Sequence, residues 1–466
     1  MKNDHITLVR SIASQVKDYF ENKKPFHIFH GSTNSTRILA FKRSEMIDVS
    51  ALNKVLAIDE KSLVATVEPN VPMDALVEAT LTKGLIPKVV MEFPGITVGG
   101  GIQGGAGESS SFRYGCFNQV CTRYEMILAD GKVVEATAKD KADLFYGTAG
   151  SFGTLGIITV ADVQLMPAKK YVHLTYLPVM SFQEAVKVLK RTAKQDYDYI
   201  DGIMFGADHG VIIVGNLSDT VVGKVRRFTR ARDPWYYLHA ESIDSRAEQV
   251  TETVLLVDYL FRYDRGGFWV GRYAFEIFKV PFTKLTRALL DTFMHTRTLY
   301  QALQESGASQ QHVVQDLALP LDKAVSFMEF IDANLQVYPL WLCPLKTDNR
   351  SPLQSNNINT PLVINVGVWG NQIASREAFL KANRLIETKL TELGGKKWFY
   401  AHSYYTRNEF WNSYDKQWYD NLRKKYNATS LPDVYDKISV KKEYEINLKR
   451  GATRAMWGRA KIRIID

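Results

Sequence analysis

The segment Thr97–Gly107, TVGGGIQGGAG, has six glycines among its last nine residues. Glycine adopts φ > 0 freely and lets backbone N–H groups approach a ligand closely, so a stretch this dense limits what can pack around it. The polar residues Glu108 and Ser109–Ser111 follow at once, where a ligand's hydroxyl and carbonyl groups would find partners. A purely structural glycine loop is the alternative. We interpret the segment as a loop that binds a ligand.

The glycine spacing does not indicate a Rossmann-type nucleotide site. Gly99, Gly101 and Gly104 formally match G-x-G-x-x-G, but that motif must follow a buried strand and open a helix. Here Pro94 and Gly95 break any preceding strand, and no helical periodicity follows. The sequence also contains no P-loop and no nucleophile elbow.

Two other segments suggest that the ligand is long. The strand-like run Phe26–Phe29 leads into HGSTNSTR, residues 30–37, whose hydroxyl and amide groups are typical of a compact anion-binding nest. Residues 144–167, LFYGTAGSFGTLGIITVADVQLMP, read as a glycine-punctuated turn entering a β-branched strand. Three unrelated turns are the alternative, but together the loops could enclose one extended cofactor.

The composition of the chain limits the number of domains and the classes of protein to which it can belong. A chain of 466 residues that is 45% hydrophobic can bury sizeable cores and is expected to form two domains. No apolar run of about 18 residues and no signal peptide occur, so we expect no membrane-spanning segment. Three cysteines, Cys116, Cys121 and Cys343, provide neither a disulfide framework nor a metal pattern, and we expect no metal site.

The net charge of +9 is concentrated in two segments. Residues 224–239, KVRRFTRARDPWYYLH, mix basic and aromatic side chains, and the tail after Val440 has eight Lys/Arg against three Asp/Glu, with Trp457 among them. No zinc finger, RNP motif or recognition helix is present, so we expect no nucleic-acid partner. Peripheral docking on a membrane and a solvated helix face with a frayed terminus both remain open.

Several motifs together resemble one family. They are VEPNVPM (67–73), TVGG with GESSSFRYGCF (107–117), CTRYEMILADGKVV (121–134), DLFY, SFGTLGII (151–158), HVVQDLALP (312–320), VYPLWLCP (337–344), YAHSYYTRNEFW (400–411) and LPDVYDKI (431–438). The sequence is similar to the sterol Δ24-reductase family, within the vanillyl-alcohol-oxidase (PCMH) type of FAD proteins. The resemblance runs with gaps from about His5 to Ile438 and is weakest around residues 170–300.

The resemblance implies an α+β fold with a two-lobed PCMH-type FAD-binding domain and an α+β cap domain whose antiparallel sheet covers the flavin. We place the FAD-binding domain at residues 1–170 and the cap at 171–440, with residues 396–440 returning to the flavin and 441–466 as a basic tail. Periodicity predicts helices over residues 6–20 and 73–83 and strands over 211–214, 313–319 and 362–368.

The resemblance also implies which residues bind FAD, which we expect to be held non-covalently because His30 precedes the nest rather than lying within it. The diphosphate nest would use Gly31, Ser32, Thr33, Asn34 and Ser35. The ribityl, adenine and hydroxyl contacts would use Thr97, Val98, Gly99, Gly100, Gly104, Gly105, Glu108, Ser109, Gly153, Thr154, Gly156, Ile157 and Ile158.

Reduction of an isolated C=C bond needs a hydride from reduced flavin and a proton from a protein acid. Comparison with related cap domains nominates Asp316, His402 and Tyr404, supported by Gln315, Tyr405 and Arg407. A buried Asp316 would have a raised pKa, and His402 would be a natural shuttle near neutral pH. The alternative for each is a hydrogen-bonded or packed core residue.

The family resemblance implies NADPH as electron donor, with Arg113, Arg262 and Arg265 as candidates for its 2′-phosphate and surface ion pairs as their alternative role. We therefore expect an FAD-dependent reductase of a C=C bond in a sterol or related isoprenoid lipid. An oxygen-using oxidase or dehydrogenase, a non-catalytic membrane- or partner-binding flavoprotein, and an alkyl-transfer lipid synthase are the alternatives. We expect a cytoplasmic location, with peripheral attachment to the endoplasmic reticulum membrane left open, as is the oligomeric state.

Overall fold

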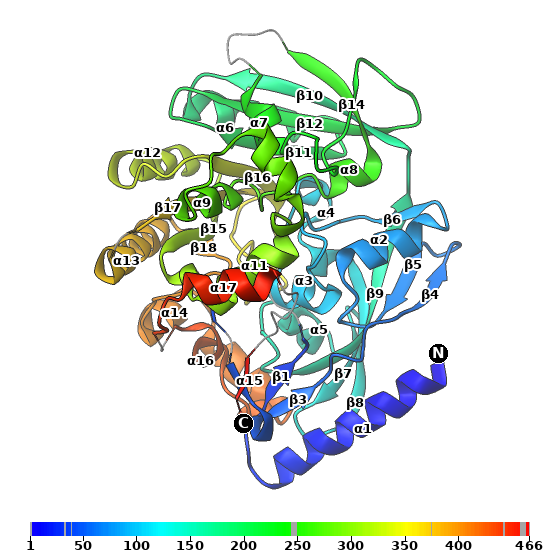
Figure 1. Ribbon diagram of the computed structural model, residues 1–466. Coiled ribbons are helices and arrows are strands. Elements are labelled where there is room, and N and C mark those ends of the chain that lie inside the picture. The colour runs from blue at the N-terminus through cyan, green and yellow to red at the C-terminus, as the bar shows by residue number, and fades with distance from the viewer. Residues whose placement is uncertain are drawn as a thin grey trace.

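The computed structural model describes residues 2–31, 34–38, 40–243, 249–373, 375–440, 443–456 and 463–465. Ser32 and Thr33, expected in the diphosphate nest, and Trp457 of the tail lie outside these ranges. The chain forms two α+β lobes, and the mixture of helices and antiparallel sheets confirms the predicted α+β class (Figure 1).

The N-terminal lobe is built on a six-stranded sheet in the order β4-β5-β9-β7-β8, with β6 pairing beside β9. Helix α1 (Lys2–Glu21) presents Val9, Ile12 and Val16 to the core at helical spacing and packs against β3 and β7, as its periodicity predicts. β1 and β3 form a separate parallel pair. The elements are β1 (His27–Phe29), β2 (Ala40–Lys42), β3 (Met46–Asp48), β4 (Val55–Asp59), β5 (Val64–Val67), α2 (Met73–Leu81), β6 (Leu85–Pro87), α3 (Val98–Gly104), α4 (Ser111–Tyr114), β7 (Cys121–Leu128), β8 (Val133–Thr137), α5 (Ala142–Thr148) and β9 (Gly156–Pro167).

The glycine-rich segment is a short helix, α3, so the expectation of an irregular loop is wrong. The Thr97 hydroxyl caps it by accepting a hydrogen bond from Gly100 N at 3.2 Å, and Gly105 ends it in the left-handed conformation (φ 61°). Close packing explains one of its glycines. A Cβ at Gly99 would stand 2.8 Å from Pro69 Cβ. Tertiary contact therefore overrides the low helix propensity of glycine.

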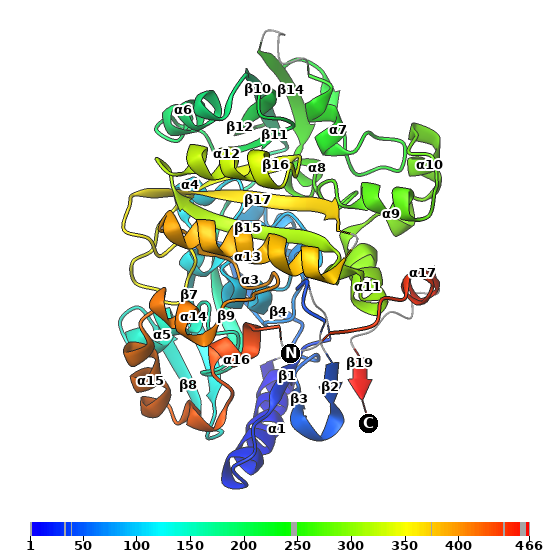
Figure 2. The ribbon, with the colours of Figure 1, turned by 90° about the vertical axis from the view of Figure 1, so that its left-hand side faces the viewer.

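The C-terminal lobe contains a nine-stranded sheet in the order β13-β14-β10-β12-β11-β16-β17-β15-β18, antiparallel except for the edge pair β13–β14. Helices α6, α12 and α13 cover its outer face (Figure 2). The elements are β10 (Tyr171–Val179), α6 (Phe182–Thr192), β11 (Tyr199–Met204), β12 (Gly210–Ser218), β13 (Val225–Arg226), β14 (Val250–Leu255), β15 (His312–Pro320), α12 (Ala324–Asn334), β16 (Leu340–Lys346), β17 (Leu362–Gln372), α13 (Arg376–Glu392) and β18 (Lys396–Lys397).

Successive side chains of a strand point to opposite sides of a sheet, so one face of this sheet packs on the core and the other lines a cavity. On β15, Val313, Leu317 and Leu319 pack into the core beneath the outer helices. Asp316, in the opposite phase, lines a cavity on the inner face, paired across the ladder with Gly367 of β17. A Cβ at Gly367 would lie 3.0 Å from Asp316 Oδ1, so the glycine leaves room for the carboxylate.

Short helices connect the lobes and close the chain. α15 packs against α5, and α17 packs against α11 (Figure 2). Their bounds are α7 (Tyr236–Glu241), α8 (Leu256–Leu260), α9 (Gly271–Ile277), α10 (Lys284–Leu289), α11 (Thr296–Ser306), α14 (Arg407–Asn412), α15 (Lys416–Lys425), α16 (Val434–Ile438), α17 (Leu448–Met456) and the strand β19 (Arg463–Ile465), which pairs with β2.

The aromatic side chains of residues 224–239 are structural. Phe228, Trp235, Tyr236 and Tyr237 are all buried, so they are not available to a membrane surface. In the described ranges no helix combines the length and the apolar character that crossing a bilayer requires.

Candidate functional site

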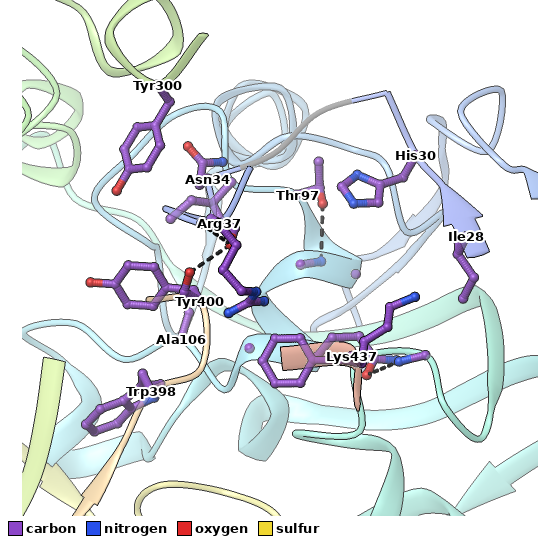
Figure 3. A pocket seen from close by; sticks show the side chains of 18 of the residues that line it. Ile28, His30, Asn34, Arg37, Thr97, Ala106, Tyr300, Trp398, Tyr400 and Lys437 are labelled. Carbon is purple, nitrogen blue, oxygen red and sulfur yellow. Dashed lines mark hydrogen bonds between the residues drawn. The ribbon is translucent and has the colours of Figure 1, made fainter. Parts of the chain in front are cut away.

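A cavity of about 560 Å³ lies between the two lobes and is lined by both of them. Its N-terminal wall comes from β1, the segment after it, α3 and the start of β9. Its C-terminal wall comes from β15, β16, β17 and the returning segments around residues 398–402 and 432–440. Figure 3 shows the pocket with Tyr300, Tyr400 and Trp398 on the left and Ile28, His30 and Lys437 on the right.

Backbone from α3 and from the loop before β9 forms one wall. Gly104 is open toward the cavity, because a Cβ there would meet no protein atom within 4 Å. The Gln103 side chain holds the neighbouring loop by accepting hydrogen bonds from Ser151 Oγ at 3.0 Å and Gly153 N at 3.1 Å. This wall therefore exposes main chain to a ligand.

Ten of the expected cofactor residues line the cavity: Asn34, Ser35, Thr97, Gly99, Gly100, Gly104, Gly153, Gly156, Ile157 and Ile158. Six others of the described set do not: Gly31, Val98, Gly105, Glu108, Ser109 and Thr154. Their positions have local causes. Val98 is core, the Thr154 hydroxyl pairs with Tyr419 at 2.7 Å, and the Ser109 hydroxyl contacts both Glu108 Oε2 at 2.8 Å and Tyr259 at 3.0 Å.

The segment 34–38 is held by the returning chain rather than by its own lobe. Ser35 Oγ donates to Tyr400 O at 2.7 Å, and Thr36 N donates to the same carbonyl at 3.0 Å. Arg37 Nη1 donates to the carbonyls of Phe399 and Ala401. The loop's position therefore depends on residues more than 360 positions later in the sequence.

Two cations line the cavity, Arg37, which is buried, and Lys437, which is partly buried (Figure 3). Burial lowers the pKa of Arg37 to about 10, and burial together with the charge of Arg37 lowers the pKa of Lys437 to about 8. Within the described part of the chain no carboxylate forms an ion pair with either. The carboxylates beside Lys437, Asp433 and Asp436, are engaged by Arg407. Sequence reasoning did not nominate either cation, although both lie in motifs that it quoted.

Asp316 faces the cavity from β15 and is satisfied by three neutral donors. Its Oδ2 accepts from the Tyr400 hydroxyl at 2.6 Å, and its Oδ1 accepts from Asn365 Nδ2 at 3.0 Å and Trp369 Nε1 at 3.4 Å. Burial raises the pKa of Asp316, and these hydrogen bonds oppose the increase. The expected direction of that shift is confirmed.

Of the other two nominated acids, His402 lines the cavity and Tyr404 does not. His402 lines the cavity, with its Nδ1 3.2 Å from Thr36 Oγ1, but burial and the charges of Arg37 and Lys397 lower its pKa to about 3. A histidine with that pKa is neutral at pH 7, so it carries no imidazolium proton to donate. Tyr404 does not line the cavity; it packs against Phe379 of α13 and accepts from Arg376 at 3.3 Å.

The supporting candidates also have structural partners. Gln315 Nε2 donates to Asn383 Oδ1 at 2.6 Å and to His402 O at 3.0 Å on the outer side of the sheet. Tyr405 packs against the core, and Arg407 joins α14 to α16 through its two aspartates. None of the three lines the cavity.

An aromatic wall encloses the end of the cavity nearest Asp316. Phe93 lies edge-on to Phe268 and Trp369, with ring centroids 5.6 and 6.0 Å apart, and Tyr300 lies 6.0 Å from Phe93. Trp341 packs on Phe268 at 5.1 Å. All five residues line the cavity, so this end suits an apolar or planar ligand.

Sequence reasoning missed another carboxyl group that lines this cavity, Glu92, which is 7% exposed. Its Oε1 is buried and has no hydrogen-bond partner in the part of the chain that the structure describes. Burial and the nearby charge of Glu108 raise the pKa of Glu92 well above its usual value. The residue stands alone in MEFPGI, and no local pattern marks it.

The arginines nominated for a nucleotide phosphate are paired elsewhere. Arg262 binds Asp201 at 2.8 Å with both side chains buried, Arg265 binds Asp291 at 2.7 Å, and Arg113 binds Asp196 at 2.6 Å. None lines the cavity. The described residues contain no cluster of three or more His, Cys, Asp or Glu side chains suited to a metal ion, and all three cysteines are buried and unpaired.

The residues present fit FAD. Arg37, which is buried, and Lys437, which is partly buried, form no ion pair with a carboxylate of the described residues and suit a diphosphate. The open glycine wall admits an extended chain past Gly104, and the aromatic wall suits a planar ring. The fold and the cavity thus describe a two-lobed FAD-binding protein with a cap over the cofactor site. In agreement, residues 8–137 match the model of the FAD binding domain family.

Comparison of the whole chain with known proteins shows which family of FAD-binding proteins it resembles. The chain is 30% identical to the Delta(24)-sterol reductases of Macaca fascicularis and Homo sapiens, over 93% of this chain and 86% of theirs. It is 29% identical to the Delta(24)-sterol reductase of Arabidopsis thaliana, over 82% of this chain and 74% of that protein. The chain belongs to the Delta(24)-sterol reductase family, and it is an FAD-dependent oxidoreductase acting on a CH–CH group.

Proposed function

We propose that this chain reduces an isolated C=C bond in the side chain of a sterol or a closely related isoprenoid lipid, with NADPH as the source of electrons. The observation that carries the proposal is the cavity, which joins FAD-binding features at one end to an aromatic wall with buried carboxyl groups at the other. The names of the relatives support the choice of substrate.

Reduced FAD, when bound, supplies the hydride for one carbon of the double bond. The chain's own residues have three tasks. Arg37, Lys437 and the glycine wall would hold the cofactor's phosphates and chain non-covalently. The aromatic wall of Phe93, Phe268, Tyr300, Trp341 and Trp369 binds the apolar substrate and excludes water. A buried acid delivers the proton to the other carbon, which is easier from a dry site where the neutral acid is favoured.

NADPH must transfer its electrons without a second nucleotide-binding lobe. The arginines expected to meet its 2′-phosphate are held in ion pairs away from the cavity. We therefore infer a transient encounter at the cavity, with the nicotinamide leaving before the lipid enters.

Anaerobic stopped-flow spectroscopy tests the proposal. NADPH should bleach the oxidised flavin, and a Δ24-unsaturated sterol should then restore its colour while the product gains two hydrogens. A flavin that is not reduced by NADPH, but is reduced by a lipid and reoxidised by air, would favour an oxidase. A flavin that responds to neither would favour a binding protein, and an alkylated product would favour a lipid synthase.

We also propose that the protein docks on the cytoplasmic face of the endoplasmic reticulum membrane, because its substrate resides in lipid. The support is three exposed apolar side chains within residues 278–289, which we call the apolar patch: Phe278, Leu285 and Leu289, which are 51%, 68% and 73% exposed. Lys279, Lys284 and Arg287 lie in the same stretch. Exposed apolar side chains flanked by basic residues are typical of an interface with anionic lipid.

A further inference from the structure

Three carboxyl groups line the cavity: Glu92, Asp316 and Asp436. Asp436 is paired with Arg407 at 2.7 Å. Glu92 and Asp316 differ in what surrounds their oxygens. Asp316 accepts hydrogen bonds from Tyr400, Asn365 and Trp369, so both of its oxygens are occupied by donors. Glu92 has a buried Oε1 to which no atom of the described residues donates a hydrogen bond. Donors favour the ionised form of a carboxyl group, whereas a buried oxygen without donors favours the protonated form.

We propose that Glu92 is the proton donor of the reduction and that its carboxylic acid protonates the carbon of the double bond that does not receive the hydride. This assignment rests on the proposed function. Asp316 then acts as a hydrogen-bond acceptor that fixes Tyr400 and the cavity wall.

The surroundings of Glu92 keep the proton on it. Charge on Glu108 and Asp201 disfavours ionisation of Glu92, and the charge of Arg262 opposes this effect. Arg262 is itself engaged by Asp201 at 2.8 Å, so it is not free to neutralise Glu92. Across the cavity, the Tyr400 hydroxyl is committed to Asp316. Burial and the neighbouring carboxylates therefore favour a neutral acid at pH 7.

The backbone fixes this acid beside the apolar end of the cavity. Phe93, the next residue, packs against Phe268, Tyr300 and Trp369. The turn that follows is closed by Ile96 N donating to Phe93 O at 3.1 Å, and α2 is joined to it by Met73 N donating to Ile96 O at 2.9 Å. A substrate chain lying on this aromatic wall would therefore be adjacent to Glu92.

The step balances as follows. The π electrons of the double bond form a new C–H bond with the Glu92 proton while the O–H bond breaks and its electron pair remains on the carboxylate. The other carbon accepts the hydride that the reduced cofactor supplies. The Glu92 carboxylate recovers its proton from water after the product leaves.

The experiment compares wild type with Glu92→Gln, Glu92→Asp and Glu305→Gln. Glu305 is a matched control because it is buried but lies outside the cavity, paired with Arg450 at 3.4 Å. Infrared spectroscopy of the oxidised holoprotein at pH 7 should show the carbonyl stretch of a protonated carboxylic acid in wild type and Glu305→Gln. That band should be absent in Glu92→Gln.

Single-turnover sterol reduction by pre-reduced enzyme should then fall about 100-fold or more in Glu92→Gln, because a general acid contributes at least that much. Glu92→Asp should recover part of the rate, and flavin content and bleaching by NADPH should match wild type. An unchanged infrared band or a wild-type rate in Glu92→Gln overturns the assignment. If wild type itself reduces no sterol, the proposed function fails first, and the assignment fails with it.

Discussion

The Tyr400 hydroxyl donates a 2.6 Å hydrogen bond to Asp316 Oδ2 and so joins the returning segment after β18 to strand β15 inside the cavity wall. Tyr400 also contacts the N-terminal lobe, because its backbone carbonyl accepts hydrogen bonds from Ser35 Oγ and Thr36 N. One residue thus connects the loop expected to hold the diphosphate with the carboxylate at the aromatic end.

Tyr400→Phe should make stability more sensitive to pH. Burial raises the pKa of Asp316 in the folded protein above its value in the unfolded chain. The free energy of unfolding of the protein therefore falls as the pH rises from the ordinary aspartate pKa to the raised one. Removing the Tyr400 donor raises that pKa further and extends the loss to higher pH. The free energy of unfolding should fall by about 1.5–3 kcal/mol at pH 7 and by less at pH 4.

Denaturant unfolding at saturating FAD, repeated from pH 4 to pH 8, measures this difference. Tyr414→Phe is the control, since Tyr414 is also buried but has no carboxylate partner among the hydrogen bonds of the described residues. A deficit that is the same at every pH would show that Asp316 does not depend on Tyr400.

Gly104→Ala should separate cofactor binding from stability. The added Cβ meets no protein atom within 4 Å and projects toward the cavity. Alanine favours a helix over glycine by up to about 1 kcal/mol, so stability should hold or rise. FAD affinity should fall about tenfold, equivalent to about 1.4 kcal/mol. Fluorescence titration and denaturant unfolding measure the two quantities, and unchanged affinity would mean that FAD does not pass Gly104.

Elements with a clear period were predictable from the sequence. The apolar spacing over residues 6–20 gave α1, observed at 2–21, and the β-branched runs at 313–319 and 362–368 gave β15 and β17. One side of each of these elements packs on the core, so its apolar residues recur at a regular spacing within a single segment of the sequence.

Features that depend on distant contacts were not predictable. α3 forms from glycines because Thr97 caps it and the chain at Pro69 packs against it. Glu92 and Lys437 are isolated residues that line a cavity formed where the two lobes meet. In the irregular segment 398–405, sequence could not tell that His402 faces the cavity and Tyr404 the outer helix α13.

Acid precipitation should release the flavin into solution as FAD. His30 lines the cavity, and its Nδ1 has no hydrogen-bond partner among the described residues. Burial and the charge of Lys437 lower the pKa of His30 to about 4, so it is a neutral imidazole close to the cofactor site. The predicted non-covalent attachment requires a colourless pellet and a yellow supernatant. A yellow, fluorescent pellet that becomes colourless in His30→Ala would instead identify a covalent bond at His30.

Leu285→Ser combined with Leu289→Ser should weaken binding to vesicles that contain anionic phospholipid. The two leucines are the most exposed large apolar side chains of the described residues, and their transfer into lipid is worth about 1.5–3 kcal/mol each. Sedimentation with vesicles should show the loss, whereas Val133→Ser with Val221→Ser, exposed elsewhere, should bind like wild type. Equal binding by both double variants would exclude this patch as the docking surface.

Lys437 should make FAD binding depend on pH. Burial and the charge of Arg37 lower the pKa of Lys437 to about 8 in the free protein, and a bound diphosphate would favour the ammonium and raise it. FAD affinity should therefore be constant below pH 8 and fall above it, by up to about tenfold per pH unit, until the raised pKa is reached. Lys437→Met should weaken binding about 10- to 100-fold at pH 7 and remove this decline.

Lys396 provides the matched control for that titration. Burial lowers its pKa to about 8 as well, yet it lies over the Tyr414 ring and does not line the cavity. Lys396→Met should therefore keep both the affinity and the pH profile of wild type, as measured by FAD titration between pH 6.5 and pH 9.5. A decline above pH 8 that persists in Lys437→Met would assign the proton to another group and remove Lys437 from the diphosphate site.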